Sequence, residues 1–495
     1  MVEKVNMNHF SHYINGGWVG SSDKKKRSIL TPYDSTLICE VSEGSKDDVL
    51  IAVKAAREAF DNKYFHTLNK LDRSKILAKL SQKIIEDKEE LAKLESINTG
   101  KTMEESRWDM DDIANVFSYY AGLIKNDVDR KITNIKADVE SEIIKEPIGV
   151  CSLILPWNYP LLQASWKIAP AFAAGCSMII KPSELTPLTT IKLMEYIDEF
   201  NLPKGVFNLV LGDGINVGEE MSKNTSIDMV SFTGGIETGK RIMRNAADNV
   251  KKVTLELGGK NPHIIFKDAD LDTALDFICN GVFFHCGQIC SAGSRVLIEK
   301  DIFDELSRKI VEKAEKIKLG FPFEKDVQMG SLISQKQLDK VKYYIESAKK
   351  EGAKILLGGS QPNDNRLSKG YFYLPTVITN CNSKMEIVQN EVFGPVITLE
   401  SFENMEEAVS LANDTIYGLS AGFWTSDQVK MDYLSSNLRF GTVWINDFNV
   451  YYPYAPWGGY KQSGIGRELS DEGLLEYYEI KHIYKNKNNK PVGWF

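Results

Sequence analysis

A series of short apolar segments between residues 150 and 266 constrains the fold of this chain more than any other feature. Most of these segments are followed by turn residues and then by a helical pattern; they read VCSLIL, SMII, FNLVL, MVSF, VTLEL and HIIF. Strands that alternate with helices pack side by side as a parallel, doubly wound sheet. A second alternating series runs from about residue 263 to 440. The sequence therefore predicts an α/β fold with two such units.

Other stretches of the chain have helical or strand-like patterns. Residues 45–61 begin with Ser45 and Asp48 at the spacing of a helix N-cap and its third residue, and apolar residues then recur at helical spacing. Residues 71–95 are predicted to form a second long amphipathic helix. Residues 131–149 and the tail 478–495 mix polar and apolar residues, which predicts exposed strands.

Length, charge and cysteine usage exclude several classes of protein. The 495 residues suggest about three domains, and the net charge of −8 argues against a nucleic-acid groove within a global positive field. The start of the chain lacks the apolar core of a signal peptide, and no apolar run reaches the ~18 residues of a membrane-spanning helix. The seven cysteines are too thinly spread for a disulfide framework. We therefore expect a cytoplasmic protein that binds neither nucleic acid nor membrane.

Two glycine-rich stretches are candidates for holding a phosphate. Residues 212–218 follow the strand FNLVL but are one residue too long for the G-x-G-x-x-G pattern, which favours a plain strand-to-helix turn. Residues 232–239, FTGGIETG, lie between a strand and a helix, where Gly234, Gly235 and Gly239 would let a pyrophosphate approach free N–H groups. A tight turn explains this second stretch equally well on local grounds.

Lys181 and Glu184 lie just past the carboxyl end of a strand, and open α/β sheets bind their ligands at the carboxyl ends of the strands. A carboxylate there accepts hydrogen bonds from two ribose hydroxyls and repels a 2′-phosphate, so Glu184 favours NAD over NADP. The alternative is a solvated charge pair on a loop.

Cys290 lies in a small, polar, loop-like context, GQICSAGSR, which is typical of a reactive thiol more than of a core residue. Cys39, Cys151, Cys176, Cys279 and Cys381 have apolar or strand-like neighbours and are interpreted as buried, whereas Cys286, next to His285, is not. Zinc is disfavoured for Cys286 and Cys290 because a second ligand pair at zinc-site spacing is missing from the sequence.

Two further polar residues stand in unusual surroundings. Glu256 lies inside an apolar strand, where burial would raise its pKa toward the range of a general base; the alternative is a strand residue that faces solvent. Asn158 lies in PWNYP, where two prolines hold the turn rigid, as an oxyanion donor requires. A buried Asn that caps a turn explains the same pattern.

Together these segments resemble the NAD(P)-dependent aldehyde dehydrogenase superfamily. The motifs stand in the family's order along nearly the whole chain: PWNYP, KPSELTP, FTGGIETG, LELGGK, GQICSAGSR, EVFGP, WIND and GGYKQSGIGRE. The resemblance implies a Rossmann-like NAD-binding domain of residues 1–130 and 150–262 and an α/β catalytic domain of residues 263–445. Residues 446–477 would return to the cofactor side and the substrate tunnel, and strands 131–149 and 478–495 would form a small β element for homo-oligomer assembly, as dimer or tetramer.

The resemblance also assigns roles to single residues. It implies Cys290 as nucleophile, Glu256 as the base that activates water, and Asn158 with the Cys290 backbone N–H as the oxyanion hole. Lys167 and Glu468 match a supporting charge relay, and otherwise are structural ion-pair members. The implied cofactor contacts are Leu155, Pro156, Trp157, Lys181, Ser183, Glu184, Gly234, Gly235, Ile236, Glu237, Thr238, Gly239, Gly258, Glu391 and Phe393.

The reaction implied by this resemblance begins with attack of the Cys290 thiolate on an aldehyde carbonyl. Loss of a hydride to NAD converts the thiohemiacetal into a thioester, and water activated by Glu256 then releases a carboxylate.

Within the superfamily the chain looks most similar to the betaine aldehyde dehydrogenases, which make glycine betaine, an osmoprotectant, from choline. Aromatic faces hold a trimethylammonium group by cation–π attraction, and the candidate box is Tyr159, Trp166, Phe284, Trp457 and Tyr451. Core packing is the alternative for each of these rings. An ω-aminoaldehyde or broad-specificity aldehyde dehydrogenase shares every catalytic residue, so the substrate stays open between them. A cysteine hydrolase without NAD, and an inactive binding protein, fit the cofactor and catalytic motifs less well.

Two further expectations concern regulation and metals. The subfamily tends to bind potassium, and Lys461 and Gly464 match one such site. Cys286, four residues from Cys290, is predicted to form a reversible disulfide that blocks the nucleophile under oxidation, with a bystander thiol as the alternative.

Overall fold

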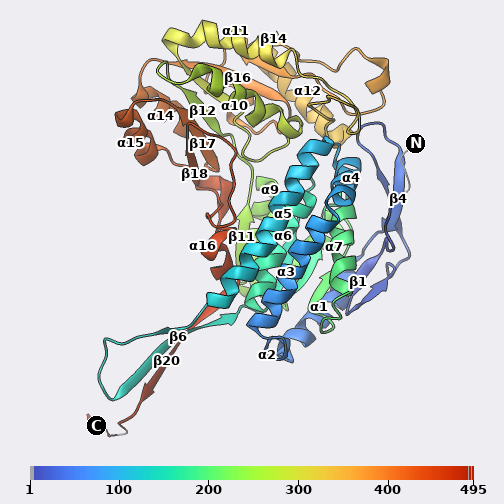
Figure 1. The fold of residues 1–495 in the computed structure, drawn as a ribbon, viewed down its shortest axis with the longest axis vertical. Helices are drawn as coiled ribbons and strands as arrows, with labels where there is room; N and C mark the ends of the chain where they lie inside the picture. The colour runs from blue at the N-terminus through green and yellow to red at the C-terminus, as the bar shows by residue number, and fades with distance from the viewer. Residues whose placement is uncertain (1–4, 489, 492, 495) are drawn as a thin grey trace.

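The computed structural model describes residues 5–488, 490–491 and 493–494. Two α/β parts lie one above the other in Figure 1, and a long β arm projects from the lower part. Positions 489, 492 and 495 of the predicted strand 478–495 lie outside the described residues.

The lower part contains a mostly parallel sheet with the strand order β19-β11-β10-β7-β8-β9-β1-β2. The strands β7 to β11 correspond to the first five apolar segments of the sequence, which confirms them as buried parallel strands. The bounds are β1 His12–Ile14, β2 Gly17–Val19, β7 Val150–Ile154, β8 Ser177–Lys181, β9 Phe207–Leu209, β10 Met229–Thr233, β11 Lys252–Glu256 and β19 Gly464–Ile465. Strands β3 Lys26–Leu30 and β4 Leu37–Ser42 follow β2 in the chain and form a separate antiparallel sheet of two strands.

Helices cover this sheet, and α3, α5 and α6 pack side by side. The helix predicted at 45–61 is confirmed as α1 Lys46–Asp61, with a capping box between Ser45 and Asp48. The single helix predicted over 71–95 is wrong, because the chain bends at Asp87 into α3 Lys70–Glu86 and α4 Lys88–Thr99. The other helices are α2 Tyr64–Thr67, α5 Met103–Leu123, α6 Pro160–Ala174, α7 Leu188–Asp198, α8 Glu219–Lys223, α9 Ile236–Ala246 and α16 Ser470–Leu475.

The upper part contains the second predicted series, as a sheet with the order β14-β15-β16-β13-β12-β17-β18. Neighbouring strands are parallel except for β14 and β15. The strands are β12 Pro262–Ile265, β13 Arg295–Glu299, β14 Lys354–Leu357, β15 Thr376–Thr379, β16 Val396–Phe402, β17 Ser420–Trp424 and β18 Thr442–Ile445. The helices are α10 Leu271–Phe283, α11 Phe303–Ala314, α12 Gln335–Lys350, α13 Glu386–Gln389, α14 Met405–Asn413 and α15 Gln428–Asn437.

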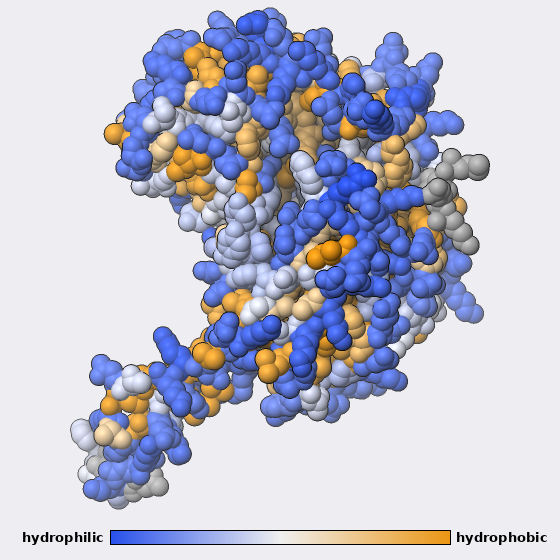
Figure 2. Space-filling view, viewed as in Figure 1, coloured by the Kyte–Doolittle hydropathy of each residue, from blue (hydrophilic) through white to orange (hydrophobic). Residues whose placement is uncertain are grey.

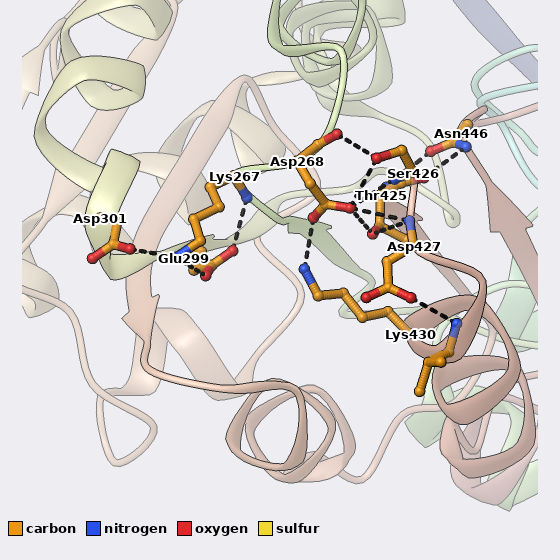
Figure 3. A network of polar contacts seen from close by, with 10 residues as sticks. Lys267, Asp268, Glu299, Asp301, Thr425, Ser426, Asp427, Lys430 and Asn446 are labelled. Carbon is orange, nitrogen blue, oxygen red and sulfur yellow. Dashed lines mark hydrogen bonds and ion pairs between the residues drawn. The ribbon is translucent and has the colours of Figure 1, made fainter.

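A polar network around Asp268 joins the ends of β12 and β17 to α15 (Figure 3). Its carboxylate accepts hydrogen bonds from the Thr425 hydroxyl at 2.6 Å, from the Ser426 backbone N–H at 2.9 Å and from the Lys430 ammonium at 2.7 Å. Burial opposes ionisation, but these donors hold the pKa of Asp268 well below its usual range. The network therefore fixes the outer end of this sheet, away from the loops that carry Cys290.

The arm consists of β5 Arg130–Lys131, β6 Val139–Pro147 and β20 Tyr478–Asn486, in the order β20-β6-β5. Strands β6 and β20 pair along their full lengths, and hydrophobic residues lie open on their surface among polar ones (Figure 2). Ile480 is 57% exposed and Tyr484 is 59% exposed. Domain boundaries at residues 131, 150, 263 and 446 stay predictions. No helix among the described residues is long and apolar enough to cross a membrane.

Candidate active site

A cavity of about 260 Å³ has Cys290 in its wall. Helices α5, α6 and α10 and the segment 448–457 supply most of the rest of the lining. The cavity brings together the five aromatic residues that were predicted to form a box, Tyr159, Trp166, Phe284, Tyr451 and Trp457. Asn158, Glu256 and the predicted cofactor contacts lie outside this lining.

The aromatic rings of the cavity pack against one another. The ring centres of Tyr451 and Trp457 are 4.9 Å apart, and those of Trp166 and Trp457 are 6.3 Å apart. Phe284 instead stacks on Trp108 of α5 with 5.7 Å between ring centres. The cavity therefore has one wall of three mutually packed rings and a second wall of two stacked rings.

Sequence reasoning missed four cavity residues on α5, which are Trp108, Asp109, Asp112 and Val116. Helical spacing places Asp112 and Val116 one and two turns after Trp108, on one face. The sequence does contain a Trp within an acidic helix, which is unusual. Nothing in the sequence, however, indicates that a residue so far from Cys290 lines the same cavity.

The two carboxylates differ in their electrostatic surroundings. Asp109 forms an ion pair with the buried ammonium of Lys101, which also lies 3.7 Å from the centre of the Tyr159 ring. Asp112 lacks an ion-pair partner among the described residues, and loss of solvation with the charges of Asp109 and Asp111 raises its pKa to about 7. The cavity thus carries one neutralised carboxylate and one that changes charge near neutral pH.

Neighbouring residues fix the backbone of Cys290. Its carbonyl oxygen accepts a hydrogen bond of 2.8 Å from the Asn261 amide, and Gly259 packs so closely that a Cβ there would lie 2.5 Å from this oxygen. Burial, followed by the charges of Glu391 and Glu256, raises the pKa of the Cys290 thiol above its usual range. The thiol is therefore protonated at rest and needs a base, or a change in these charges, before it attacks a carbonyl.

Asn158 is buried at the end of the loop after β7 and turns its side chain toward the loop that carries Cys290. Its amide Nδ2 donates a hydrogen bond of 2.9 Å to the backbone carbonyl of Gln288. Because an amide nitrogen carries two hydrogens, one N–H is committed to Gln288 and the other stays available to a substrate oxygen.

Glu256 ends strand β11 and is buried, so the solvent-facing alternative is wrong. Neither carboxylate oxygen makes a hydrogen bond of normal geometry with the described residues. Burial and the charge of Glu468 raise its pKa well above the usual range, against the opposing charges of Lys167 and Arg467. Lys167 and Glu468 form a buried ion pair, as the sequence allowed.

The predicted adenosine contacts gather at the carboxyl end of β8. The Lys181 ammonium is buried, donates a hydrogen bond of 2.9 Å to the Pro182 carbonyl and lies 3.7 Å from a Glu184 oxygen. Burial lowers the pKa of Lys181. Ser183 accepts a hydrogen bond of 3.3 Å from the Leu185 N–H, and Leu155 donates its N–H to the Lys181 carbonyl at 2.9 Å.

The two glycine-rich stretches differ in whether their backbone N–H groups are already bonded. Asp213 caps the 214–218 turn by accepting hydrogen bonds from the N–H groups of Ile215 and Asn216, which uses the donors that a phosphate would need. Helix α9 starts at Gly235 without a side-chain cap, and a Cβ on Gly235 would meet no atom within 4 Å among the described residues. The backbone N–H groups of Ile236, Glu237 and Thr238 in the first turn of α9 therefore have no acceptor among the described residues and suit an anion, whereas the Gly239 N–H already donates to the Gly235 carbonyl at 3.0 Å.

The remaining cofactor candidates surround Gly258. A Cβ on Gly258 would lie 2.5 Å from a Glu391 oxygen, and Glu391 accepts a hydrogen bond of 3.0 Å from the Gly259 N–H. Trp157 packs edge-on against Phe393, with 5.2 Å between ring centres. The segments that contain Pro156, Gly234 and Glu391 thus end on the same side as the strand ends that bear Lys181.

Cys286 differs from its expected surroundings. It is fully buried in the core of the upper sheet, whereas Cys290 packs at the edge of the lower core. Both thiols are free, and the reversible disulfide stays a prediction. The prediction that Cys286 does not fit a buried cysteine is wrong, because tertiary packing covers a locally polar segment.

Lys461, one residue of the predicted potassium site, uses its side-chain ammonium in other hydrogen bonds. The Lys461 ammonium donates hydrogen bonds to the carbonyls of Asn413 at 2.9 Å and Thr415 at 3.2 Å. Gly464 lies in the short edge strand β19 beside Glu256. The hydrogen bonds of Lys461 involve its side chain and not its backbone carbonyl, so the potassium site at Lys461 and Gly464 stays a prediction.

Comparisons with known proteins place the chain in a family. Residues 18–483 match the family model described as "Aldehyde dehydrogenase family". The chain is 55% identical to a Bacillus subtilis protein named betaine aldehyde dehydrogenase over 98% of this chain and 99% of that protein. It is 43% identical to aminoaldehyde dehydrogenase 1, peroxisomal, of Pisum sativum over 98% and 97%.

Solved structures agree with the sequence comparisons. A crystal structure of betaine aldehyde dehydrogenase from Staphylococcus aureus, in complex with NAD+, superimposes with a TM-score of 0.98. The two sequences are 52% identical, and the match covers 99% of this chain and 98% of the other. By fold, motif order and identity along nearly its whole length, this chain belongs to the aldehyde dehydrogenase family.

Proposed function

We propose that this chain oxidises betaine aldehyde to glycine betaine with NAD, as the step that completes osmoprotectant synthesis from choline. The observation that carries the proposal is the cavity in which Cys290 and the rings of Tyr159, Trp166 and Trp457 share one lining. The 55% identity to a protein named for this activity supports the same substrate.

The substrate's trimethylammonium group has no N–H to donate, so an aromatic wall suits it better than a hydrogen-bonding one. Each good cation–π contact is worth about 0.5–2 kcal/mol. Three packed rings, Trp166, Tyr451 and Trp457, supply such faces, and the stacked pair of Trp108 and Phe284 lines the same cavity. The Asp112 carboxylate, when ionised, adds negative charge to the same cavity.

Chemistry in this proposal begins at Cys290. The thiolate forms a bond to the aldehyde carbon, and the carbonyl oxygen gains negative charge as its π bond breaks. The free N–H of Asn158 and the backbone N–H of Cys290 donate to that oxygen, which lowers the barrier to attack. The thiol proton leaves to a base before or during the attack.

Thioester hydrolysis in this proposal is the work of Glu256. Once the thiohemiacetal has been oxidised, Glu256 accepts a proton from water, and the resulting hydroxide attacks the thioester carbon and releases the carboxylate from Cys290. Glu468 and Lys167 act as positioning residues, because their charges shift the pKa of Glu256 in opposite directions.

NAD fits residues of the lower sheet. The uncapped first turn of α9 suits the pyrophosphate, Lys181, Ser183 and Glu184 suit the adenosine ribose, and Glu391 with Phe393 suits the nicotinamide ribose. Leu155, Pro156, Trp157 and Gly258 would border the same site. When bound there, NAD supplies the hydride acceptor that the oxidation requires.

A second candidate substrate is an ω-aminoaldehyde. Asp112 favours it, because a primary ammonium group donates hydrogen bonds to a carboxylate, which a trimethylammonium group cannot do. The aromatic rings serve either cation.

Initial rates of NADH or NADPH formation with four aldehydes test the proposal. The set is betaine aldehyde, its neutral isostere 3,3-dimethylbutanal, 4-aminobutyraldehyde and propanal, each with NAD and with NADP. We expect betaine aldehyde with NAD to have the highest kcat/KM. Equal rates for betaine aldehyde and its isostere would refute recognition of the cation, a lead for 4-aminobutyraldehyde would favour the second candidate, and an NADP preference would refute the role of Glu184.

We further infer a cytoplasmic homo-oligomer that assembles through the arm. The support is the edge strand β20, which leaves Ile480 and Tyr484 exposed. No step of the proposed mechanism uses potassium.

A further inference from the structure

The loop that leads to Cys290 has a strained backbone. His285, Cys286 and Gly287 follow one another in the left-handed region, with φ values of 47°, 54° and 71°. Residues with a Cβ pay about 1–2 kcal/mol for this conformation, so it persists only where neighbouring groups hold it. The start of the loop is held by Glu105, which accepts a hydrogen bond of 2.6 Å from the His285 N–H.

Gln288 holds the end of the same loop. Its side chain is fully buried, and its Oε1 accepts a hydrogen bond of 2.9 Å from the Ile333 N–H. Its Nε2 donates to the carbonyls of His285 at 3.3 Å and Ser331 at 3.5 Å. The amide therefore bridges the strained loop and the segment 331–333, which lies just before α12.

The backbone carbonyl of Gln288 is also the acceptor for the Asn158 amide, at 2.9 Å. The position of this carbonyl determines where the first N–H of Asn158 points. Because the amide group is planar, it thereby determines where the second N–H points as well. A shift of the 285–288 loop would therefore move the Asn158 donor.

We propose that Gln288 is a positioning residue for the oxyanion hole, acting through its carbonyl on Asn158. The inference rests on the proposed role of Asn158 in carbonyl polarisation. A role in loop stability alone predicts a different result, since a structural defect would add to the loss of Asn158 instead of depending on it.

A double-mutant cycle separates the two roles. Asn158→Ala is expected to lower kcat by about 10²–10³-fold, the usual effect of losing an oxyanion donor. Gln288→Met keeps the side-chain volume but removes its hydrogen bonds, and we expect about a 10- to 100-fold lower kcat with the KM for NAD unchanged. In the Asn158→Ala background the same change is expected to lower kcat by less than about 3-fold.

Asn208→Leu is the matched control. This buried amide on β9 donates to the carbonyls of Met178 and Gly205, so its loss costs stability away from the loop. Its effect on kcat is expected to be the same with and without Asn158. Should Gln288→Met fail to fold, Gln288→Asn, which keeps the amide but is one methylene shorter, takes its place in the cycle.

Each outcome bears on the proposal. Equal losses for Gln288→Met in both backgrounds, or an unchanged kcat in the single variant, would overturn it. An unchanged kcat for Asn158→Ala would overturn both the oxyanion role and the inference. The cycle is run with whichever aldehyde reacts fastest, so failure of the betaine aldehyde proposal alone leaves a coupled pair intact.

Discussion

Lys167 and Glu468 form an ion pair that is buried beside Glu256, although 301 residues separate them in sequence. The pair arises because α6 carries Lys167 and the segment after β19 carries Glu468 back to the lower sheet. Its members act on the Glu256 carboxyl with opposite signs: Glu468 raises the pKa and Lys167 lowers it. Removing either charge should therefore move the ionisation of Glu256 in a known direction.

We expect Glu468→Gln to shift the acid limb of the kcat–pH profile to lower pH, by about one unit or more. The reason is that loss of the negative charge lowers the pKa of Glu256, so the base is deprotonated over a wider range. Lys167→Met should shift the same limb to higher pH. Steady-state kcat between pH 5 and pH 10 measures both shifts.

Glu476→Gln is the control for this experiment. Glu476 pairs with Lys252 at 3.0 Å, at the start of the strand that Glu256 ends. Its removal changes the same amount of charge without a direct effect on Glu256, so the acid limb should stay in place. Shifts of the same sign in Glu468→Gln and Lys167→Met would contradict the electrostatic explanation.

The aromatic wall gives a second prediction. Trp166→Leu should lower kcat/KM for betaine aldehyde by about 2- to 30-fold, the equivalent of one cation–π contact. For 3,3-dimethylbutanal the same variant should lose much less, because that aldehyde has the shape without the charge. Parallel losses for the two aldehydes would mean that Trp166 serves packing and not recognition of the cation.

The strands could be predicted from sequence because their residues are buried on both faces and need no partner information. Helix boundaries were harder: the apolar spacing continues through Asp87, so one helix was predicted where α3 and α4 are separate. The Asp87 carboxylate accepts a hydrogen bond of 2.7 Å from the Tyr196 hydroxyl, a contact that only the tertiary fold supplies.

Some residues of the candidate site could be predicted from local sequence, and others only from tertiary contacts. Cys290, Glu256 and Asn158 stand in short motifs whose local chemistry is unusual, so single-sequence reasoning finds them. Trp108 and Asp112 enter the cavity from a helix far away in sequence, and the hydrogen bond from Asn158 reaches the backbone carbonyl of Gln288, a contact that no residue type signals. Cys286 was misjudged because polar neighbours in sequence do not imply solvent in space.

Oxidation provides a third prediction. Peroxide converts the Cys290 thiolate to a sulfenic acid, and attack by the Cys286 thiol would release water and form a disulfide that thiols reduce again. We expect activity lost to peroxide to return with dithiothreitol in the parent enzyme and to return poorly in Cys286→Ser. Burial raises the pKa of Cys286, so the disulfide should form faster at higher pH.

The matched control is Cys279→Ser, which changes a cysteine that is buried in the same upper core but eleven residues from the nucleophile. Its recovery should equal that of the parent. The idea fails if Cys286→Ser is inactivated as irreversibly as the parent and dithiothreitol rescues neither.

The arm provides a fourth prediction. Ile480→Asp places a charge on the exposed face of β20, and we expect it to lower the mass of the assembly measured by light scattering after size-exclusion chromatography. Glu479→Ala, at the neighbouring and already polar position, should leave the mass unchanged. A parent enzyme that runs as a monomer would refute assembly through the arm.

Asp112 gives a last prediction, because its charge is the one in the cavity that changes near neutral pH. With its pKa raised to about 7, the carboxylate is mostly protonated below that pH and charged above it. The KM for cationic aldehydes should therefore fall as pH rises through 7, and the KM for propanal should not. Asp112→Asn should raise the KM for 4-aminobutyraldehyde by about 10- to 150-fold, the range for loss of one charge-assisted hydrogen bond, and abolish this pH dependence. Asp111→Asn is the control: Asp111 turns outward to bond Lys88 at 2.7 Å, so the pH-dependent KM should remain, with its midpoint moved to lower pH because the charge of Asp111 raises the pKa of Asp112. A pH-dependent KM that survives in Asp112→Asn would assign the effect to another group.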